Sequence, residues 1–519
     1  MADGPLIGPP AGPPASPPAG LPAGPPAATS VATQVATQVN RGVAWAAAAQ
    51  AVIAVSDLIS QLLVLALWVG AADYGIASGA VAFYTLLDTA ADFGVTSALI
   101  QRDNHTPERV STVFWFNLLV SGGLLAVLLV LGPLYGYLQG QSVLGWLLIA
   151  YGGKLVFQNV YAIPFALLRK ELRFDDIAKA RIVAHLAESV GRVVFAACGM
   201  TVWCWTLAAL TRAVVFGVIV QARHPFVPRL VFRPREVLDY VRFGLRTAAS
   251  QILFRLYTSI DAPIVLYMFG KEAAGIYSAA LFIVLEPVKT ISNVVIDVAF
   301  PAFARLRADR PGLIKQFIWF TRLNLLVVLP FVVLILLVIP EYLRLLYGHN
   351  WSPAELAACG TAARVLCLVG ALRAVGFVGP PLLDGIGRPE LTLRYMMIAA
   401  IAVPGAFVLG ARVLGPYFGL LSVAIAWAVG YPVAFAALSY LVARSINLPL
   451  GAYARGSWGI AGCCLAGLVA GLGVSLALPH AGDLTRMLVI GAASLVVTLA
   501  LVVTWQKITP RSVIAAIKG

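Results

Sequence analysis

From residue 43 onward the chain is a succession of apolar windows of about 20 residues, separated by short polar breaks. A helix of that length spans the hydrocarbon core of a bilayer, which is about 30 Å thick. With 60% hydrophobic residues, 12% charged residues and a mean hydropathy of +0.88, the chain matches no soluble globular class. We predict an all-α polytopic membrane protein with about fourteen transmembrane helices, at residues 43–69, 75–100, 111–137, 143–168, 178–198, 201–222, 237–269, 275–300, 314–340, 354–383, 391–413, 417–443, 456–478 and 485–505.

Basic residues collect in every second loop between these windows. The richer set of loops contains Arg102, Arg109, Arg169, Lys170, Arg173, Arg223, Arg229, Arg233, Arg235, Arg305, Arg307, Arg310, Lys315, Arg388, Arg444 and Arg455. The opposite loops contain little beyond Lys271, Arg344, Arg412 and Arg486. Because cytoplasmic loops are enriched in Lys and Arg, both termini are predicted to be cytoplasmic, including the tail 506–519. Topology therefore explains the net charge of +14, which is no indication of nucleic-acid binding.

The first forty residues differ from the rest in being rich in Pro, Gly and Ala and nearly uncharged. Proline at this density prevents a helix, and the basic n-region and apolar core of a signal peptide are missing. We predict a disordered cytoplasmic tail at 1–40. The six cysteines lie in apolar segments without metal or redox spacing, and the five histidines are dispersed, so we expect no metal site, no cofactor and no disulfide framework.

An internal repeat relates two parts of the chain at an offset of 200 residues. The segment GAADYGIASGA, from Gly70, aligns with GKEAAGIYSAA, from Gly270, so that Gly75 falls on Gly275 and Ser78 on Ser278. Six spans per unit give both units the same orientation in the membrane, which is the parallel repeat of a two-lobed transporter. We predict lobes at 41–222 and 237–443, two further helices at 456–505, and a ligand site between the lobes.

One apolar window carries charge well inside its length. Arg181, His185, Glu188 and Arg192 follow a 4-3-4 spacing and share one face of a helix. A charge at mid-bilayer costs roughly 2.5–3.5 kcal/mol or more, so this stripe must face other helices or a wet cavity. One hypothesis is a neutralising ladder, in which Glu188 pairs with Arg192 or Arg181 and holds helices together. The other is a cavity that receives an anion, which the net positive charge of the stripe favours.

Other windows also carry ionisable residues. Asp57 shares a face with two glutamines in the first window, and Asp88 and Asp92 share a face in the second. The seventh window places Arg246 and Asp261 in one sector and Arg255 on the other side, and the eighth contains Lys289. Further basic residues in or near the windows are Arg212, Arg242, Arg322, Arg364, Arg373 and Arg394. Those near helix ends can extend their charged groups to the membrane surface.

Short motifs from residue 41 to residue 444 resemble the Wzx-type polysaccharide flippases of the multidrug/oligosaccharidyl-lipid/polysaccharide exporter superfamily. Their order and spacing carry the likeness. They are Arg41-Gly42 with Trp45, Tyr74-Gly75, Asp92-Phe93-Gly94 before Ala98-Leu99-Ile100-Gln101-Arg102, Phe114-Trp115-Phe116-Asn117, Leu168-Arg169-Lys170-Glu171-Leu172-Arg173-Phe174, Phe243-Gly244, Tyr257 with Asp261, Gly275-Ile276-Tyr277-Ser278-Ala279-Ala280, Phe300-Pro301, Leu346-Tyr347-Gly348 with Trp351, and Gly385-Ile386-Gly387-Arg388. The stripe containing Arg192 departs from the family pattern and is hypothesised to suit this chain to an acidic or large glycan.

The resemblance implies translocation of a polyprenyl-pyrophosphate-linked oligosaccharide between the leaflets of the bacterial inner membrane. The expected partners are this lipid-linked oligosaccharide, membrane lipids and, as candidates, a polysaccharide polymerase and chain-length or export proteins. The basic residues predicted to bind the substrate in a central cavity are Arg41, Arg181, His185, Arg192, Arg246, Arg255 and Lys289. The acids predicted to couple transport to an ion, or to act as salt-bridge switches, are Asp57, Asp88, Asp92, Glu188 and Asp261.

Three alternatives stay open from the sequence. Two belong to the same superfamily, namely a lipid II flippase and an ion-coupled drug exporter. The third is a polytopic glycan polymerase or ligase. No phosphate-binding loop, zinc motif or nucleophile elbow is present, and the outer loops are short, so we predict a transporter and not an enzyme.

Overall fold

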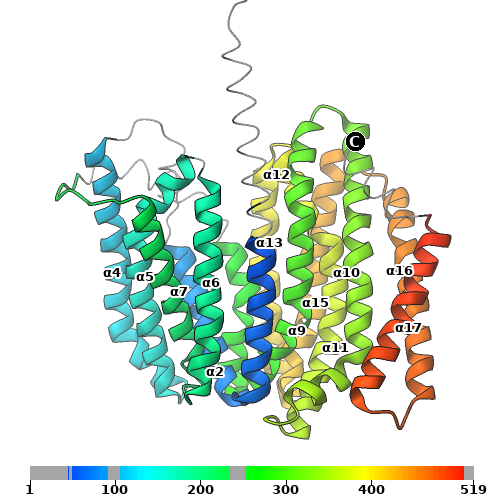
Figure 1. Cartoon of the computed structure of the whole chain (residues 1–519). Coiled ribbons are helices and arrows are strands. Elements are labelled where there is room, and N and C mark those ends of the chain that lie inside the picture. Colours follow the sequence, from blue (N-terminus) through cyan, green and yellow to red (C-terminus); the bar gives the residue numbers. More distant parts are fainter. Residues whose placement is uncertain (1–44, 46–48, 92–105, 172, 234–251, 508–519) are drawn as a thin grey trace, which may run out of the picture.

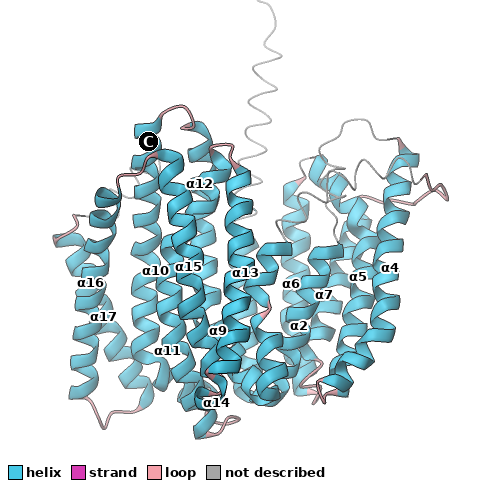
Figure 2. Cartoon of the chain, turned by 180° about the vertical axis from the view of Figure 1, so that it is seen from behind, coloured by secondary structure: helices cyan, strands magenta, loops and turns pink. Residues whose placement is uncertain are grey.

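The computed structural model describes residues 45, 49–91, 106–171, 173–233 and 252–507. Within these ranges the regular structure is α-helical, as Figure 2 shows, and the all-α prediction is confirmed. The helices are Ala49–Leu67, α2 (Ala71–Ala91), α4 (Pro107–Leu138), α5 (Ser142–Lys170), α6 (Phe174–Ala197), α7 (Cys204–Arg223), α9 (Asp261–Arg305), α10 (Arg310–Tyr347), α11 (Pro353–Gly376), α12 (Gly379–Gly385), α13 (Pro389–Val413), α14 (Gly415–Phe418), α15 (Leu421–Ile446), α16 (Leu450–Ala477) and α17 (Asp483–Thr504).

Local sequence sets several helix ends sharply. At the start of α11, Ser352 and Glu355 form a reciprocal capping box, and Pro353 occupies the first turn. Asp309 accepts a hydrogen bond from the Gly312 amide and caps α10, again with proline in the first turn. These caps confine the turns between long apolar helices to a few residues.

Eleven helices among the described residues are long and apolar enough to cross a membrane. One of them, Ile252–Arg305, has 54 residues, which is more than twice the length that a bilayer requires. Its path reverses at Gly270, where φ is +85°, a conformation that glycine adopts without the penalty of a Cβ atom. The predicted break between the seventh and eighth windows therefore lies at Gly270.

Two groups of helices stand side by side in Figure 1. We call the helices of residues 49–223 the N-terminal bundle and those of residues 252–446 the C-terminal bundle. The pair α16 and α17 packs against α10 on the outside of the C-terminal bundle, where Arg486 donates to Glu341 at 2.9 Å. Large apolar side chains such as Val130, Leu409 and Val429 are exposed on the outer faces, as expected for contact with lipid.

The two bundles meet where α2 crosses α9, near the lower face in Figure 1. A Cβ atom on Gly75 would overlap the carbonyl oxygen of Lys271 and lie 2.7 Å from the amide nitrogen of Gly275. A Cβ atom on Gly275 would overlap the carbonyl oxygen of Ala71. Gly75 and Gly275 thus allow two backbones to touch, as small residues do between membrane helices.

The crossing relates residues that are 200 positions apart. Ala71 and Lys271 face the opposite glycines, and the hydroxyl groups of Ser78 and Ser278 are hydrogen-bonded at 2.9 Å. The repeat recognised in the sequence therefore coincides with the contact between the bundles.

Two further hydrogen bonds join the bundles at the same lower face. Asn350 donates to the carbonyl oxygen of Ala66 at 2.8 Å, and the indole of Trp351 donates to that of Val69 at 3.3 Å. Both donors belong to the turn before α11, and the acceptors lie in the last turn of the first helix and just after it. The lower face is therefore held closed by direct contacts between the bundles.

Candidate functional site

Charged side chains from three helices meet inside the N-terminal bundle. We call Asp57, His185, Glu188, Arg192 and Arg212 the ionic cluster. One Arg192 nitrogen lies 2.7 Å from Asp57, and the other lies 3.9 Å from Glu188. Glu188 is also 3.3 Å from Arg212 and 3.4 Å from the His185 ring. Glu188 and Arg192 are 7% and 6% exposed, so their charges are neutralised by one another and by these neighbours and not by bulk water.

Hydrogen bonds that Arg192 donates to neutral side chains hold it in place. Its guanidinium donates to Ser60 at 3.1 Å and to the Gln61 side-chain oxygen at 3.4 Å. The same Gln61 oxygen accepts from the Trp205 indole at 2.7 Å. The Nε of Arg192 is buried and has no partner among the described residues. Arg192 therefore ties the first helix to α6 while keeping one donor unused.

A second polar group lies in the same bundle, between α2 and α5. Lys154 is only 2% exposed and donates to the Tyr84 hydroxyl at 2.5 Å. Gln158, one turn further along α5, donates to Asp88 at 3.3 Å. Together with the ionic cluster, these residues place three cations (Lys154, Arg192, Arg212) opposite three carboxylates (Asp57, Asp88, Glu188) inside one bundle.

The equal numbers of cations and carboxylates can be compared with the two hypotheses for the charged stripe of α6, a set of neutralising ion pairs or a cavity that receives an anion. Glu188 contacts both Arg192 and Arg212, so the pairing expected of a neutralising ladder is present. The arginines nevertheless need only exchange a carboxylate for a phosphate oxygen to bind an anion, because guanidinium groups pair with both in the same bidentate geometry. The cluster is thus able to alternate between internal ion pairs and a bound anionic group.

The C-terminal bundle holds a related arrangement around Asp261. Asp261 is 2% exposed, and its carboxylate accepts from the Tyr277 hydroxyl at 2.8 Å and from the Trp427 indole at 3.1 Å. In the N-terminal bundle Trp205 donates to Gln61 in the same way. Gln61 and Asp261 are 200 residues apart, which is the offset of the repeat. Each bundle therefore contains a tryptophan that donates to a buried oxygen acceptor at the same position of the repeat.

The predicted site residues do not all come together. The ionic cluster contains four of them, Asp57, His185, Glu188 and Arg192. Arg181 shares their helix, but it is exposed and its guanidinium lies 5.8 Å from the Phe165 ring. Arg181 is eleven residues from Arg192, about three turns or roughly 16 Å along the axis of α6, so it lies on a similar face but too far along the helix to join the cluster.

Other predicted residues lie elsewhere or outside the described ranges. Lys289 is partly exposed on α9 and pairs with Glu286 at 2.6 Å, while Arg255 is half-buried in the C-terminal bundle. Arg41, Asp92 and Arg246 lie outside the described residues.

Sequence reasoning missed Lys154, which the structure places in the interior. Its signal was available, because Lys154 is the single charged residue within the apolar window 143–168. An intramembrane lysine is expected to have a functional or structural partner. Arg212 was noted only as one of several buried basic residues, since no periodicity within its own window connects it to Glu188.

Comparisons with known proteins agree with this architecture. A family model described as polysaccharide biosynthesis protein matches residues 64–355. The teichuronic acid biosynthesis protein TuaB of Bacillus subtilis (strain 168) is 27% identical over 365 residues, which cover 70% of this chain and 74% of TuaB. The lipopolysaccharide biosynthesis protein WzxC of Escherichia coli (strain K12) is 25% identical over 383 residues, covering 72% of this chain and 75% of WzxC.

The fold is also found in a solved structure, that of the lipid II flippase MurJ in an inward closed conformation. The two superpose with a TM-score of 0.70 at 14% identity, over 88% of this chain and 98% of MurJ. The predicted superfamily fold and the prediction of a transporter instead of an enzyme are confirmed. The family model matches more than half of this chain. The chain therefore belongs to the polysaccharide biosynthesis protein family, as a multi-pass membrane transporter of the Wzx type.

Proposed function

We propose that this transporter flips a polyprenyl-pyrophosphate-linked oligosaccharide from the cytoplasmic to the periplasmic leaflet of the bacterial inner membrane, by alternating access between its two bundles. The observation that carries the proposal is the ionic cluster. Arg192 and Arg212 are held inside a membrane-spanning bundle by carboxylates that an anionic headgroup can replace. In this proposal the lipid tails stay in the bilayer while the pyrophosphate and sugars pass between the bundles.

The proposed membrane topology has fourteen spans in two lobes of six, followed by α16 and α17. Eleven apolar helices support it directly. Division of Ile252–Arg305 at Gly270 adds one span, and α2 and α6 supply two more. The charges of α6 (Arg181, Glu188 and Arg192) and the aspartates of α2 lower their apolar character, but each helix is long enough to cross. We place the lobes at 41–222 and 237–443.

The face with the basic loops is proposed to be cytoplasmic, since Lys and Arg accumulate on that side. Those loops include 224–233 and 306–309. The closed α2–α9 crossing lies on the opposite face, so this arrangement is the inward-facing state of the transport cycle.

Thiol labelling tests this orientation. Cys198, exposed at the end of α6, is expected to react with a membrane-impermeant maleimide in intact spheroplasts, and so are cysteines replacing Gln139 and Ala481 in a Cys198→Ser background. Cysteines replacing the exposed Leu230 and Ala308 should react only after permeabilisation. The reverse pattern would contradict both the topology and the proposed direction of transport.

A pyrophosphate diester carries about two negative charges. An inside-negative potential favours outward movement of an anion by about 2.3 kcal/mol per charge per 100 mV, so about 4–5 kcal/mol is available without a chemical fuel. Proteoliposomes that contain the purified chain and a lipid-linked oligosaccharide are expected to flip it under a potassium-diffusion potential. Flipping can be read as access of the glycan to an external glycosidase, with protein-free liposomes as the control. No flipping above that control would contradict the proposed function.

The same vesicles separate potential-driven from ion-coupled transport. We propose coupling through Glu188 or Asp261, because each is a buried acid that can exchange its present donors for an ion. A gradient of protons or sodium should then accelerate flipping, and Glu188→Gln or Asp261→Asn should remove that acceleration. If flipping driven by the potential alone is unchanged in both variants, the coupled mechanism is wrong.

Candidate partners follow from the proposed pathway. A polysaccharide polymerase and chain-length or export proteins would receive the flipped unit at the periplasmic face. Co-purification with products of neighbouring biosynthetic genes would identify them.

A further inference from the structure

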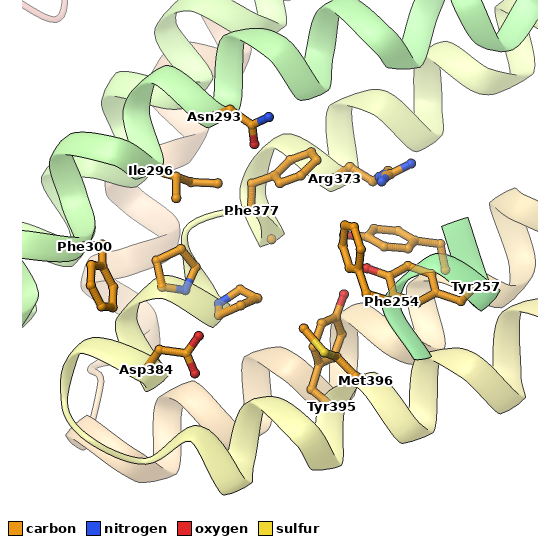
Figure 3. Close-up of a pocket in the computed structure, with 14 residues that line it drawn as sticks. Phe254, Tyr257, Asn293, Ile296, Phe300, Arg373, Phe377, Asp384, Tyr395 and Met396 are labelled. Carbon is orange, nitrogen blue, oxygen red and sulfur yellow. The ribbon is translucent and has the colours of Figure 1, made fainter. Parts of the chain in front are cut away.

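The C-terminal bundle contains a cavity of about 290 Å³ that is separate from the ionic cluster. It lies between α9, α11, α12, α13, α15 and the helical segment before α9 (Figure 3). Known ligand pockets measure about 300–1,000 Å³, so this cavity matches a small group such as one sugar ring. Six of its lining residues are aromatic, namely Phe254, Tyr257, Phe300, Phe377, Tyr395 and Tyr431.

Arg373 supplies the positive charge of this cavity. Arg373 is 8% exposed, and its guanidinium carbon lies 5.4 Å from the centre of the Phe377 ring, 5.3 Å from that of Trp427 and 5.9 Å from that of Tyr431. No carboxylate among the described residues lies within 4.0 Å of it, in contrast to Arg192 and Arg212. Aromatic rings satisfy the faces of a guanidinium but leave its N–H donors unused. A buried arginine with no carboxylate partner in the part of the chain that the structure describes therefore lines a cavity of ligand size.

The remaining polar atoms of the cavity suit hydroxyl groups. Tyr257, Tyr395 and Tyr431 line the same space as Arg373. Asn293 adds an amide, and Asp384 adds a carboxylate, one oxygen of which accepts from the Thr392 hydroxyl at 2.7 Å. Donors and acceptors between aromatic faces are the groups that bind a pyranose ring, whose C–H faces are apolar and whose edge is hydroxylated.

We propose that this cavity is a subsite for a sugar that bears a carboxylate, such as a uronic acid, with Arg373 pairing the carboxylate and the aromatic residues packing against the ring. A pyrophosphate fits less well, because it calls for several cations and this cavity offers one arginine together with Asp384. A lipid tail would leave the arginine and the tyrosine hydroxyls without partners. The subsite specifies the substrate class of the transporter and rests on the proposed function.

The inference can be tested by titrating the purified full-length chain in nanodiscs with glucuronic acid, glucose or inorganic pyrophosphate, using ligand-observed NMR. Glucuronic acid is expected to bind about tenfold more tightly than glucose, because its carboxylate adds a charge-assisted hydrogen bond with Arg373. Arg373→Gln should remove this preference, and Arg373→Lys should retain part of it. The matched control is Arg364→Gln, which removes an exposed arginine from the same helix and should leave the preference intact.

Several outcomes would overturn the subsite. Equal affinity of the wild-type chain for glucuronic acid and glucose would overturn it. This measurement does not depend on whether Arg373→Gln folds. A preference that persists in Arg373→Gln, or Arg373-dependent binding of pyrophosphate in place of glucuronic acid, would also overturn it. The proteoliposome assay is independent: flipping without glucuronic acid selectivity would reject only the subsite, and selective binding without flipping would reject only the proposed function.

Discussion

Replacing Gly75 or Gly275 by alanine is expected to abolish polysaccharide export. A methyl group at Gly75 would overlap the Lys271 carbonyl oxygen, and one at Gly275 would overlap that of Ala71. Both obstacles are backbone atoms of long helices, so neither can rotate out of the way, and α2 and α9 must separate. The closed lower face cannot then form, and alternating access requires that each face close in turn.

The closure can be measured without an export assay. The hydroxyl groups of Ser78 and Ser278 are 2.9 Å apart, so cysteines at these positions should form a disulfide on oxidation. Adding Gly75→Ala or Gly275→Ala should lower the yield of that disulfide sharply. Gly123→Ala on α4 is the matched control, because a methyl group there meets nothing within 4 Å and should change neither export nor cross-linking. Full export by both crossing variants would contradict a gate at this contact.

Arg192→Ala is expected to destabilise the chain and stop export. The substitution removes one of the two arginines beside the buried Glu188, which keeps Arg212, and leaves Asp57 without its ion pair. The Asp57 side chain is 48% exposed, so the loss of stability should be smaller than the roughly 3–5 kcal/mol that breaking a fully buried pair costs. The effect should appear as a lower amount of monodisperse protein and a lower melting temperature in detergent. Arg181→Ala, on the same helix, removes an exposed guanidinium that contacts only an aromatic ring among the described residues, and a much smaller effect on stability is expected.

A double variant distinguishes a structural role of Arg192 from a role in transport. Arg192→Met combined with Asp57→Leu replaces both charges with apolar groups, which usually restores stability. If the cluster binds the anionic headgroup, the double variant should be stable but inactive in export. Full export by a stable double variant would show that the pair only joins helices, as the ladder hypothesis states.

The chain's overall architecture was predictable from its residues because membrane helices are encoded locally. Every backbone polar group in a bilayer must be paired within its own helix, so apolar length alone predicts the spans. The sequence placed a break between the windows 237–269 and 275–300. Only the structure locates it at Gly270, whose φ is positive. Likewise, the 200-residue offset was visible in the sequence, but its meaning as a contact of Gly75 with Gly275 was not.

The sites were less predictable, because helical periodicity reports which residues share a face and not what faces them. The spacing of Glu188 and Arg192 placed both on one side of α6, but Asp57 and Arg212 reach them from helices far away in the sequence. Asp261 was predicted among arginines of its own helix, yet its described partners are Tyr277 and Trp427.

The sequence by itself determined that this chain spans a membrane as an all-α protein and that several of its helices carry charge within their apolar length, while the likeness of its motifs indicated a glycan-exporting transporter. The first two conclusions follow from the cost of exposing polar groups to lipid, which acts on each segment separately. Only the tertiary structure decided which charges are paired, as in the ionic cluster, and which lack a carboxylate partner among the described residues, as Arg373 does. The physical reason is that the electrostatic environment of a buried group is set by neighbours within a few ångströms, and packing brings those neighbours from distant parts of the chain.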